Sequence, residues 1–362
     1  MQQLMVLAPG ELEWRETAEP SLLAPTDALV RPVALSICDA DVLYLRGQLP
    51  PRAPFCFGHE FVADVTAVGE DVGDFAPGDR VVVAFLIACG RCKRCRQGYP
   101  AACLSVPPKS AYGFGIFGDW GGAACDVVRV PYAATMMARL PQGVSALDAA
   151  SAGDNLSDAF RCVADGLEEE PGAPVLIVAG GGGFASISLY AAALARALGS
   201  EQVDYLDDDP SRLAIAQSIG ANAIEAKTPP QRQGRYWLTV DASGDESGEW
   251  LTTALNSTAP YGRCTSCGIY HRPAPVPLGA MFMRGVRYTI GWANVQALMP
   301  KVLDLLARRK IALDAIHTVR PWDDMIEALE SPPPKLVLAR ADVLQQATRA
   351  PGEVRPDRGV TA

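Results

Sequence analysis

Histidine is scarce in this chain of 362 residues, because only His59, His271 and His317 are present. A site that needs an imidazole ligand or base therefore has few positions to choose from. Basic side chains are also outnumbered, with 32 Lys and Arg against 41 Asp and Glu and a net charge of −9. This charge argues against nucleic acid or an anionic membrane surface as a partner.

The first ten residues, MQQLMVLAPG, lack a basic segment and a cleavage site, so we expect no secretory signal and a cytoplasmic protein. A charge-free run, Val175 to Ala195, is long enough to cross a bilayer. Four adjacent glycines and two serines make it a poor membrane helix, and strand-forming residues precede them. We therefore expect no membrane partner.

The segment from Val175 to Arg212 carries the clearest pattern in the chain. It opens with four apolar residues that suit a strand buried on both faces. A run of four glycines, a helix-like segment from Phe184 to Leu198 that ends at Gly199, a second short strand and three aspartates follow. This order of strand, tight turn, helix, strand and acid is typical of a βαβ unit that binds a dinucleotide.

The glycine turn and the acid have separate physical roles. Glycines lack a Cβ, so their backbone can approach a pyrophosphate at the N-terminus of the following helix. The turn aligns as Gly180-x-Gly182-x-x-Ala185, with alanine where the helix packs on the strand. Asp207 lies where a carboxylate would accept the ribose hydroxyls and repel a 2′-phosphate, so we expect NAD rather than NADP.

Four of the ten cysteines lie in one short segment with the spacing C-x-x-C-x-x-C-x₇-C: Cys89, Cys92, Cys95 and Cys103. Tetrahedral zinc takes four thiolates, and C-x-x-C turns supply them in pairs. An iron–sulfur cluster competes, since C-x-x-C-x-x-C also begins ferredoxin motifs. The fourth spacing differs, however, and no proline follows Cys103. The segment predicts a structural zinc site, whereas we expect Cys264 and Cys267 to be packing residues.

The remaining patterns indicate short strands before the cysteine segment and helices near the end of the chain. Residues 1–35 alternate apolar and polar side chains between prolines, and His59 and Glu60 lie in a strand-like run. Met299 to Arg309 and Trp322 to Glu330 have amphipathic helical spacing.

Together these motifs resemble the zinc-containing medium-chain dehydrogenase/reductase family, the alcohol and polyol dehydrogenases. The matches in chain order are Cys38 with Asp41, Gly58-His59-Glu60, Pro77-Gly78-Asp79-Arg80-Val81, the four-cysteine segment, Gly121-Gly122 before Val130-Pro131, the Gly180 turn, Val240-Asp241-Ala242-Ser243-Gly244, and Gly262-Arg263 to Gly268. Order and spacing agree from about residue 4 to residue 340.

The resemblance implies an α/β fold in which a GroES-like β catalytic domain is split around a Rossmann domain, a doubly wound parallel sheet that binds NAD. The catalytic domain would span residues 1–154 with a zinc lobe at 89–103, and the Rossmann domain residues 155–288. Residues 289–345 would return to the catalytic domain. The tail, 346–362, is expected to be disordered.

The resemblance also implies a catalytic zinc held by Cys38, His59 and Asp154. Three protein ligands leave the fourth position open for a substrate oxygen. Asp154 could instead be a helix N-cap. Glu60 would be a spare ligand that approaches the metal during ligand exchange, and Asp41 would hold the His59 imidazole. In the implied reaction zinc lowers the pKa of the alcohol, and the carbinol hydride passes to the nicotinamide.

The implied contacts to cofactor and substrate come from several stretches. Phe85 and Leu43 would line the substrate pocket, and Arg212 would contact the adenosine ribose. The cofactor-binding set is Gly180, Gly182, Gly183, Phe184, Asp207, Arg212, Ser243 and Gly268.

The sequence departs from the family at the proton relay. Relatives commonly place a hydroxyl two residues after the cysteine ligand and a histidine five after it, where this chain has Ala40 and Leu43. Asp39, Tyr44 and Asp158 are the candidates to carry the proton instead, unless the enzyme does not need the relay. Asp39 also puts negative charge near the expected pyrophosphate site, which should weaken cofactor binding.

The leading hypothesis is a zinc-dependent oxidoreductase that transfers a hydride between a secondary or cyclic alcohol and NAD. A reductase of a polarised double bond or carbonyl, with altered or absent catalytic zinc, is one alternative. A catalytically silent NAD-binding protein is another. The expected partners are a small alcohol or carbonyl substrate and further copies of the chain, as a homodimer or homotetramer.

Overall fold

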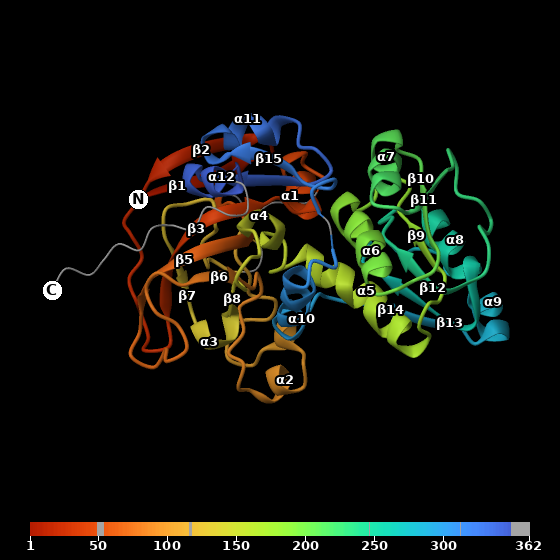
Figure 1. The fold of residues 1–362 in the computed structure, drawn as a ribbon, viewed down its shortest axis with the longest axis horizontal. Helices are drawn as coiled ribbons and strands as arrows, with labels where there is room; N and C mark the ends of the chain where they lie inside the picture. The colour runs from red at the N-terminus through yellow and green to blue at the C-terminus, as the bar shows by residue number, and fades with distance from the viewer. Residues whose placement is uncertain (49–53, 116–117, 246, 312, 349–362) are drawn as a thin grey trace.

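The computed structural model describes residues 1–48, 54–115, 118–245, 247–311 and 313–348. Residues 349–362, most of the tail expected to be disordered, lie outside the described residues. Figure 1 shows two bodies side by side, one formed by both ends of the described chain and the other by its middle. Helix α5 (Asn155–Glu169) runs between them.

The middle of the chain forms a six-stranded sheet in which all neighbouring strands are parallel. Its strand order is β11-β10-β9-β12-β13-β14, so the direction of winding reverses between β9 and β12. The strands are β9 (Val175–Val178), β10 (Val203–Asp207), β11 (Asn222–Glu225), β12 (Tyr236–Asp241), β13 (Thr258–Ser266) and β14 (Arg287–Ile290). In such doubly wound sheets, ligands bind at the carboxyl ends of the strands where the order reverses.

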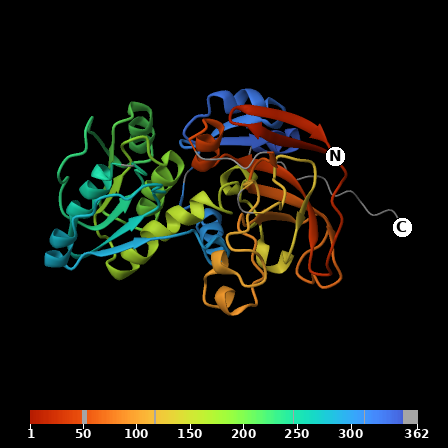
Figure 2. The same cartoon turned by 180° about the vertical axis from the view of Figure 1, so that it is seen from behind.

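Helices on both faces complete this body, as the two opposite views show (Figures 1 and 2). They are α5, α6 (Ala185–Ala197), α7 (Pro210–Ser218), α8 (Glu249–Ser257) and α9 (Leu278–Arg284). The predicted strand Val175–Val178 is confirmed, and α6 agrees with the predicted helix to within one residue at each end. The charge-free run is therefore strand, turn and helix, and among the described residues no helix is both long and apolar enough to cross a bilayer.

The other body is built on a seven-stranded sheet with mostly antiparallel pairing. Its strands are β15 (Thr318–Pro321), β16 (Leu336–Ala339), β3 (Ala28–Ser36), β5 (Glu60–Val68), β6 (Arg80–Val83), β8 (Met137–Arg139) and β7 (Val128–Val130). A smaller sheet contains β1 (Gln2–Ala8), β2 (Glu11–Glu16) and β4 (Phe55–Cys56). Because β16 pairs with β3, strands from the first and the last part of the described chain belong to the same sheet.

This body also contains several helices, most of them short. They are α1 (Asp39–Leu45), α2 (Lys93–Arg96), α3 (Ala133–Met136), α4 (Ala146–Ala149), α10 (Val295–Ala307), α11 (Met325–Glu330), α12 (Ala341–Thr348) and the 3₁₀ turns η1 (Pro100–Ala102) and η2 (Trp322–Asp324).

The predicted helix Met299–Arg309 differs from the observed α10, which begins four residues earlier and contains Pro300. Proline has no N–H for the helical bond to the preceding turn, so it was expected near the helix start. Burial explains the difference, because Val295 and Met299 are 0% and 1% exposed and anchor the first turn in the core.

Candidate active site and metal centres

Three segments that are far apart in sequence end at the same place. Cys38 precedes α1, His59 precedes β5, and Asp154 occupies the N-cap position of α5. The possible ligand atoms of Cys38, His59, Glu60 and Asp154 all lie within 4.8 Å of one another, and all four residues are buried. The structure thus brings together the catalytic ligand set that the resemblance implies, with Glu60 beside it.

The Asp154 carboxylate faces this cluster and not its own helix. Its backbone has φ −154° and ψ −95°, and its side chain accepts no capping hydrogen bond from the described residues of α5. Instead Oδ2 lies 3.2 Å from Nε2 of His59. Asp154 therefore holds the N-cap position of α5 without capping the helix through its side chain.

Asp41 and Asn155 hold the cluster from two sides. Asp41 accepts a hydrogen bond from the backbone N–H of Cys38 at 3.0 Å, and its other oxygen lies 3.4 Å from Nδ1 of His59. Asn155 donates its amide to Cys38 Sγ at 3.2 Å and to Asp154 Oδ2 at 3.1 Å. Contacts of this kind orient the ligands of a metal.

Lys335 is a fully buried cation at the site, with 0% exposure. Its Nζ donates to Glu60 Oε2 at 3.0 Å, Asn155 Oδ1 at 3.0 Å and the Ile37 carbonyl at 2.9 Å. Sequence reasoning missed Lys335 and Asn155. The available signals were weak: Asn155 follows a proposed ligand, and Lys335 precedes the apolar run of β16.

The electrostatics of the cluster suit a divalent cation. Burial lowers the pKa of His59, but Asp41 and Asp154 outweigh burial and raise that pKa well above its ordinary value. Burial and Asp154 raise the pKa of Cys38 to about 12, and burial raises the pKa of Glu60. Oε1 of Glu60 has no hydrogen-bond partner among the described residues. A buried group of thiol, imidazole and carboxylates with an unsatisfied acceptor fits zinc.

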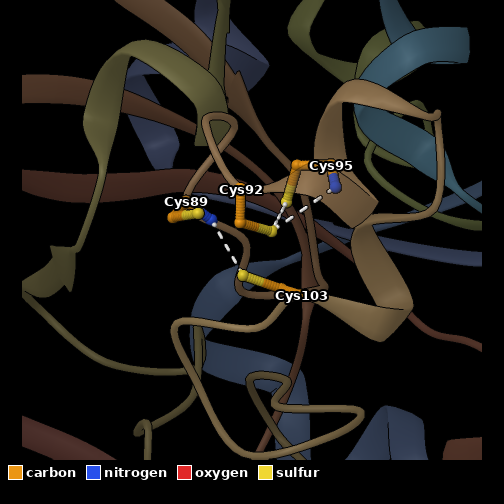
Figure 3. A group of neighbouring side chains, drawn as sticks. All are labelled: Cys89, Cys92, Cys95 and Cys103. Atoms are coloured by element: carbon orange, nitrogen blue, oxygen red, sulfur yellow. Dashed lines mark hydrogen bonds between the residues drawn. The ribbon is translucent and has the colours of Figure 1, made fainter.

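The four-cysteine segment folds into a separate lobe around α2. Figure 3 shows the four cysteine side chains turned toward one another, and their sulfur atoms lie within 4.8 Å of one another. The Sγ atoms of Cys92 and Cys95 are 3.4 Å apart, slightly closer than the roughly 3.8 Å expected around tetrahedral zinc. The arrangement fits a zinc ion held by four thiolates.

Backbone N–H groups donate hydrogen bonds to the cysteine sulfur atoms of this lobe. Leu104 and Cys95 donate to Cys92 Sγ at 3.4 and 3.5 Å, and they lower the pKa of Cys92 to about 6. Cys89 donates its N–H to Cys103 Sγ at 3.4 Å, and the Ser105 hydroxyl donates to Cys89 Sγ at 3.2 Å. Donors aimed at sulfur stabilise the thiolate form that a metal requires.

A cleft of about 820 Å³ lies at the carboxyl ends of β9 and β12. Its lining contains these members of the expected cofactor and substrate sets: Gly182, Gly183, Phe184, Arg212, Ser243 and Leu43. Gly182 has φ +78°, and an added Cβ there would meet no described atom within 4 Å, so its backbone is open to a ligand. Gly180 instead packs on Trp250, and Gly268 donates its N–H to Ser266 Oγ at 3.2 Å.

Asp207 and Arg212 contact each other. Arg212 donates its Nε to Asp207 Oδ2 at 2.7 Å, and both residues are buried. The N–H groups of Asp208 and Asp209 donate to Asp207 Oδ1 at 2.7 and 3.1 Å. The two residues expected at the ribose are therefore placed side by side, and Arg212 also lines the cleft.

Asp39 accounts for part of the contact between the two bodies. Its carboxylate accepts hydrogen bonds from the Ser186 N–H and hydroxyl, both at 3.1 Å, at the first turn of α6. Negative charge at a helix N-terminus is favourable. Asp158 is likewise engaged, at 2.6 Å from Arg161 Nε, and the buried Tyr44 hydroxyl has no partner among the described residues.

An aromatic wall, formed by Phe85, Phe114 and Trp292, lies beside His59. The centroid of the His59 ring is 4.3 Å from that of Phe114 and 5.8 Å from that of Phe85. Phe85 stacks on Trp292, with 6.5 Å between the ring centroids. Phe85 was expected here. Phe114 and Trp292 were missed, since single aromatic residues in loops carry no pattern.

Residues 24–142 match the alcohol dehydrogenase GroES-like domain. The chain is 30% identical to a glutathione-independent formaldehyde dehydrogenase of Pseudomonas aeruginosa, over 80% of this chain and 81% of that protein. It is 28% identical to a geraniol dehydrogenase of Castellaniella defragrans, over 84% and 87%. The solved alcohol dehydrogenase of Thermus sp. ATN1 superposes with a TM-score of 0.81 at 31% identity, over 94% of this chain and 100% of that one. With its split fold, its two candidate metal centres and these relatives, the chain belongs to the zinc-containing medium-chain dehydrogenase/reductase family, that of the alcohol and polyol dehydrogenases.

Proposed function

We propose that the protein transfers a hydride between a secondary or cyclic alcohol and NAD, with zinc at the Cys38 cluster. One observation carries the proposal. Ile37 and Asp39, on either side of Cys38, line the same cleft as Gly182 and Gly183 of the glycine turn. The residues that flank one candidate metal ligand and the dinucleotide-binding turn thus border the same space, and hydride transfer requires the metal centre and the cofactor to lie close together.

The residues of the cluster have distinct roles in this proposal. Cys38, His59 and Asp154 would hold the metal, which supplies a Lewis acid that polarises the substrate oxygen. Asp41 orients His59 and the loop of Cys38, and Asn155 fixes the positions of Cys38 and Asp154. In the lobe, Cys89, Cys92, Cys95 and Cys103 would hold a second zinc whose four protein ligands leave no open position.

The substrate class follows from the walls around His59. Phe85, Phe114 and Trp292 supply flat apolar surface. Such a wall suits an alcohol with a ring or a branched carbon body, because the surface buries apolar area beside the reacting carbon.

The preference for NAD follows from the charges at the end of β10. Asp207, Asp208 and Asp209 are consecutive carboxylates, and the nearby cation, Arg212, is already paired with Asp207. A 2′-phosphate there would meet net negative charge. A ribose could still use carboxylate oxygens as acceptors.

We further propose the domain division that the sequence suggests, 1–154, 155–288 and 289–345, with one change. Because β14 pairs with β13 up to Ile290, the Rossmann domain is extended to residue 290 and the return to the catalytic domain begins at residue 291.

A homodimer or homotetramer is supported by β14, the edge strand of its sheet, and by exposed apolar side chains near it. These are Tyr261, Leu278, Phe282, Met283 and Ile290. The four-thiolate lobe favours a reducing cytoplasm.

The test combines elemental analysis with a panel of primary, secondary and cyclic alcohols, each assayed with NAD and NADP. We expect two zinc ions per subunit and NAD-dependent oxidation fastest with secondary or cyclic alcohols. One zinc, NADH binding and no turnover would support the silent NAD-binding protein instead. Activity restricted to NADPH-dependent reduction of double bonds or carbonyls would support the reductase.

A further inference from the structure

A chain of hydrogen bonds leads from Glu60 to His317. The Ser151 hydroxyl donates to Glu60 Oε2 at 2.5 Å. The Tyr190 hydroxyl lies 3.1 Å from Ser151 Oγ and 2.7 Å from His317 Nε2. Each of these distances is within the range of a hydrogen bond.

The chain runs from fully buried residues to a partly exposed one. Glu60, Ser151 and Tyr190 are each 0% exposed, whereas His317 is partly exposed. Its members come from β5, the turn before α5, helix α6 and the segment before β15, so both bodies contribute. A continuous buried chain of hydroxyls that joins a carboxylate to a partly exposed imidazole is an arrangement that can conduct protons.

The inner end of the chain meets the candidate metal site. Glu60 offers a carboxylate oxygen that lies within 4.8 Å of the possible ligand atoms of Cys38, His59 and Asp154. Its Oε2 accepts hydrogen bonds from the Ser151 hydroxyl and from Lys335 Nζ, the latter at 3.0 Å. Its Oε1 has no hydrogen-bond partner among the described residues.

We propose that Ser151, Tyr190 and His317 form the proton path between Glu60 in the active site and the protein surface. The proposal rests on the dehydrogenase function proposed above. It supplies the route that Ala40 and Leu43 cannot provide. Asp39 and Asp158, two earlier candidates, are engaged with Ser186 and Arg161.

The transfers balance along the chain. When an alcohol is oxidised, the hydride leaves with its electron pair to NAD, and the hydroxyl proton must leave separately. In the structure Ser151 donates to Glu60 and Tyr190 donates to Ser151, so both hydroxyls must turn toward the surface before a proton can move outward. Once they have turned, a proton carried on the Glu60 oxygen that faces Ser151 passes to Ser151 Oγ, which gives its own proton to Tyr190. Tyr190 gives its proton to Nε2 of His317, and the ring releases the proton on Nδ1 to water. Carbonyl reduction runs the same steps in reverse.

The state of His317 suits a relay. Burial, and then the charge of Lys335, lower the pKa of His317 to about 3. The imidazole therefore rests neutral, with one nitrogen free to accept while the other donates. It does not keep the proton that it receives.

The test compares His317→Ala and Tyr190→Phe with wild type on the best alcohol of the panel. We expect kcat to fall at least about 10-fold in both variants. Imidazole added to the buffer should restore kcat in His317→Ala but not in Tyr190→Phe, with wild type assayed in parallel to correct for inhibition. Tyr112→Phe is the matched control, because it also removes a buried hydroxyl, which donates to the Arg129 carbonyl at 3.0 Å.

A second readout does not depend on turnover. In ¹⁵N NMR of the purified protein, Tyr190→Phe should shift the His317 Nε2 resonance, while Tyr112→Phe should not. Wild-type kcat in both chain variants, or equal rescue of both by imidazole, would overturn the path and leave the dehydrogenase proposal standing. A wild type that turns over no alcohol would overturn both.

Discussion

Both candidate metal centres contain cysteine thiols, but the chain assembles the two centres differently. The lobe takes all its ligands from residues 89–103, so one short loop builds the whole centre. The Cys38 cluster takes its ligands from residues 38, 59 and 154 and its supports from Asn155 and Lys335. A centre assembled from distant segments can keep an open side, whereas a closed loop of four thiolates cannot.

The surroundings of the two centres also differ. The lobe cysteines accept hydrogen bonds from local backbone N–H groups, and Cys92 and Cys95 are partly exposed. The Cys38 cluster is buried, contains carboxylates, and is contacted by one buried lysine. We therefore expect the lobe to determine stability and the Cys38 cluster to determine reactivity.

The largest effect is expected from Cys38→Ser. Loss of the thiolate should remove one zinc per subunit and lower kcat/KM roughly 1,000-fold, because metal polarisation of the substrate contributes several kcal/mol. Zinc content and alcohol oxidation measure this. Cys264→Ser, at a fully buried thiol outside both clusters, is the control and should keep both zinc ions. Two zinc ions in Cys38→Ser would contradict the assignment.

Asn155→Leu should lower kcat/KM by about 10- to 100-fold, with a parallel loss of metal affinity at the Cys38 cluster. The variant keeps the side-chain volume but removes the amide that joins Lys335 to Cys38 and Asp154. Metal-competition titration separates this affinity loss from unfolding. Asn222→Leu, which removes an amide bound to Asp204 at 3.0 Å, should leave the activity unchanged.

Cys103→Ser should lower the stability of the protein and leave its kcat almost unchanged. The melting temperature should fall by several degrees, since each kcal/mol corresponds to roughly 2–4 °C in domains of about 150–250 residues. The kcat of the molecules that remain folded should stay near the wild-type value. Calorimetry and activity on the same sample check both parts, and a loss of kcat without a loss of stability would break the contrast between the centres.

Ser105→Ala is expected to give the smallest effect. It removes the hydroxyl that donates to Cys89 Sγ at 3.2 Å, a contact worth about 1 kcal/mol. Zinc should leave the lobe about fivefold faster in a chelator assay, with kcat unchanged. Ser110→Ala loses only a local bond to the Pro107 carbonyl and serves as the control.

Sequence patterns were sufficient wherever the interacting residues are close in the chain. The βαβ unit around Gly182 and the cysteine lobe could be predicted because turn geometry, helix spacing and C-x-x-C steps are local properties. The family resemblance extended this to the split fold. It also suggested Cys38, His59 and Asp154, which the structure brings together.

Tertiary structure alone decided what surrounds those residues. The contacts of Lys335 with Glu60 and of Tyr190 with His317 join positions 275 and 127 residues apart. It also paired Arg212 with Asp207 and placed Phe114 beside His59. No periodicity or spacing encodes such contacts, because a hydrogen bond or ring contact depends on where two elements finally pack. The sequence by itself determined which groups could do chemistry, and packing determined which of them meet.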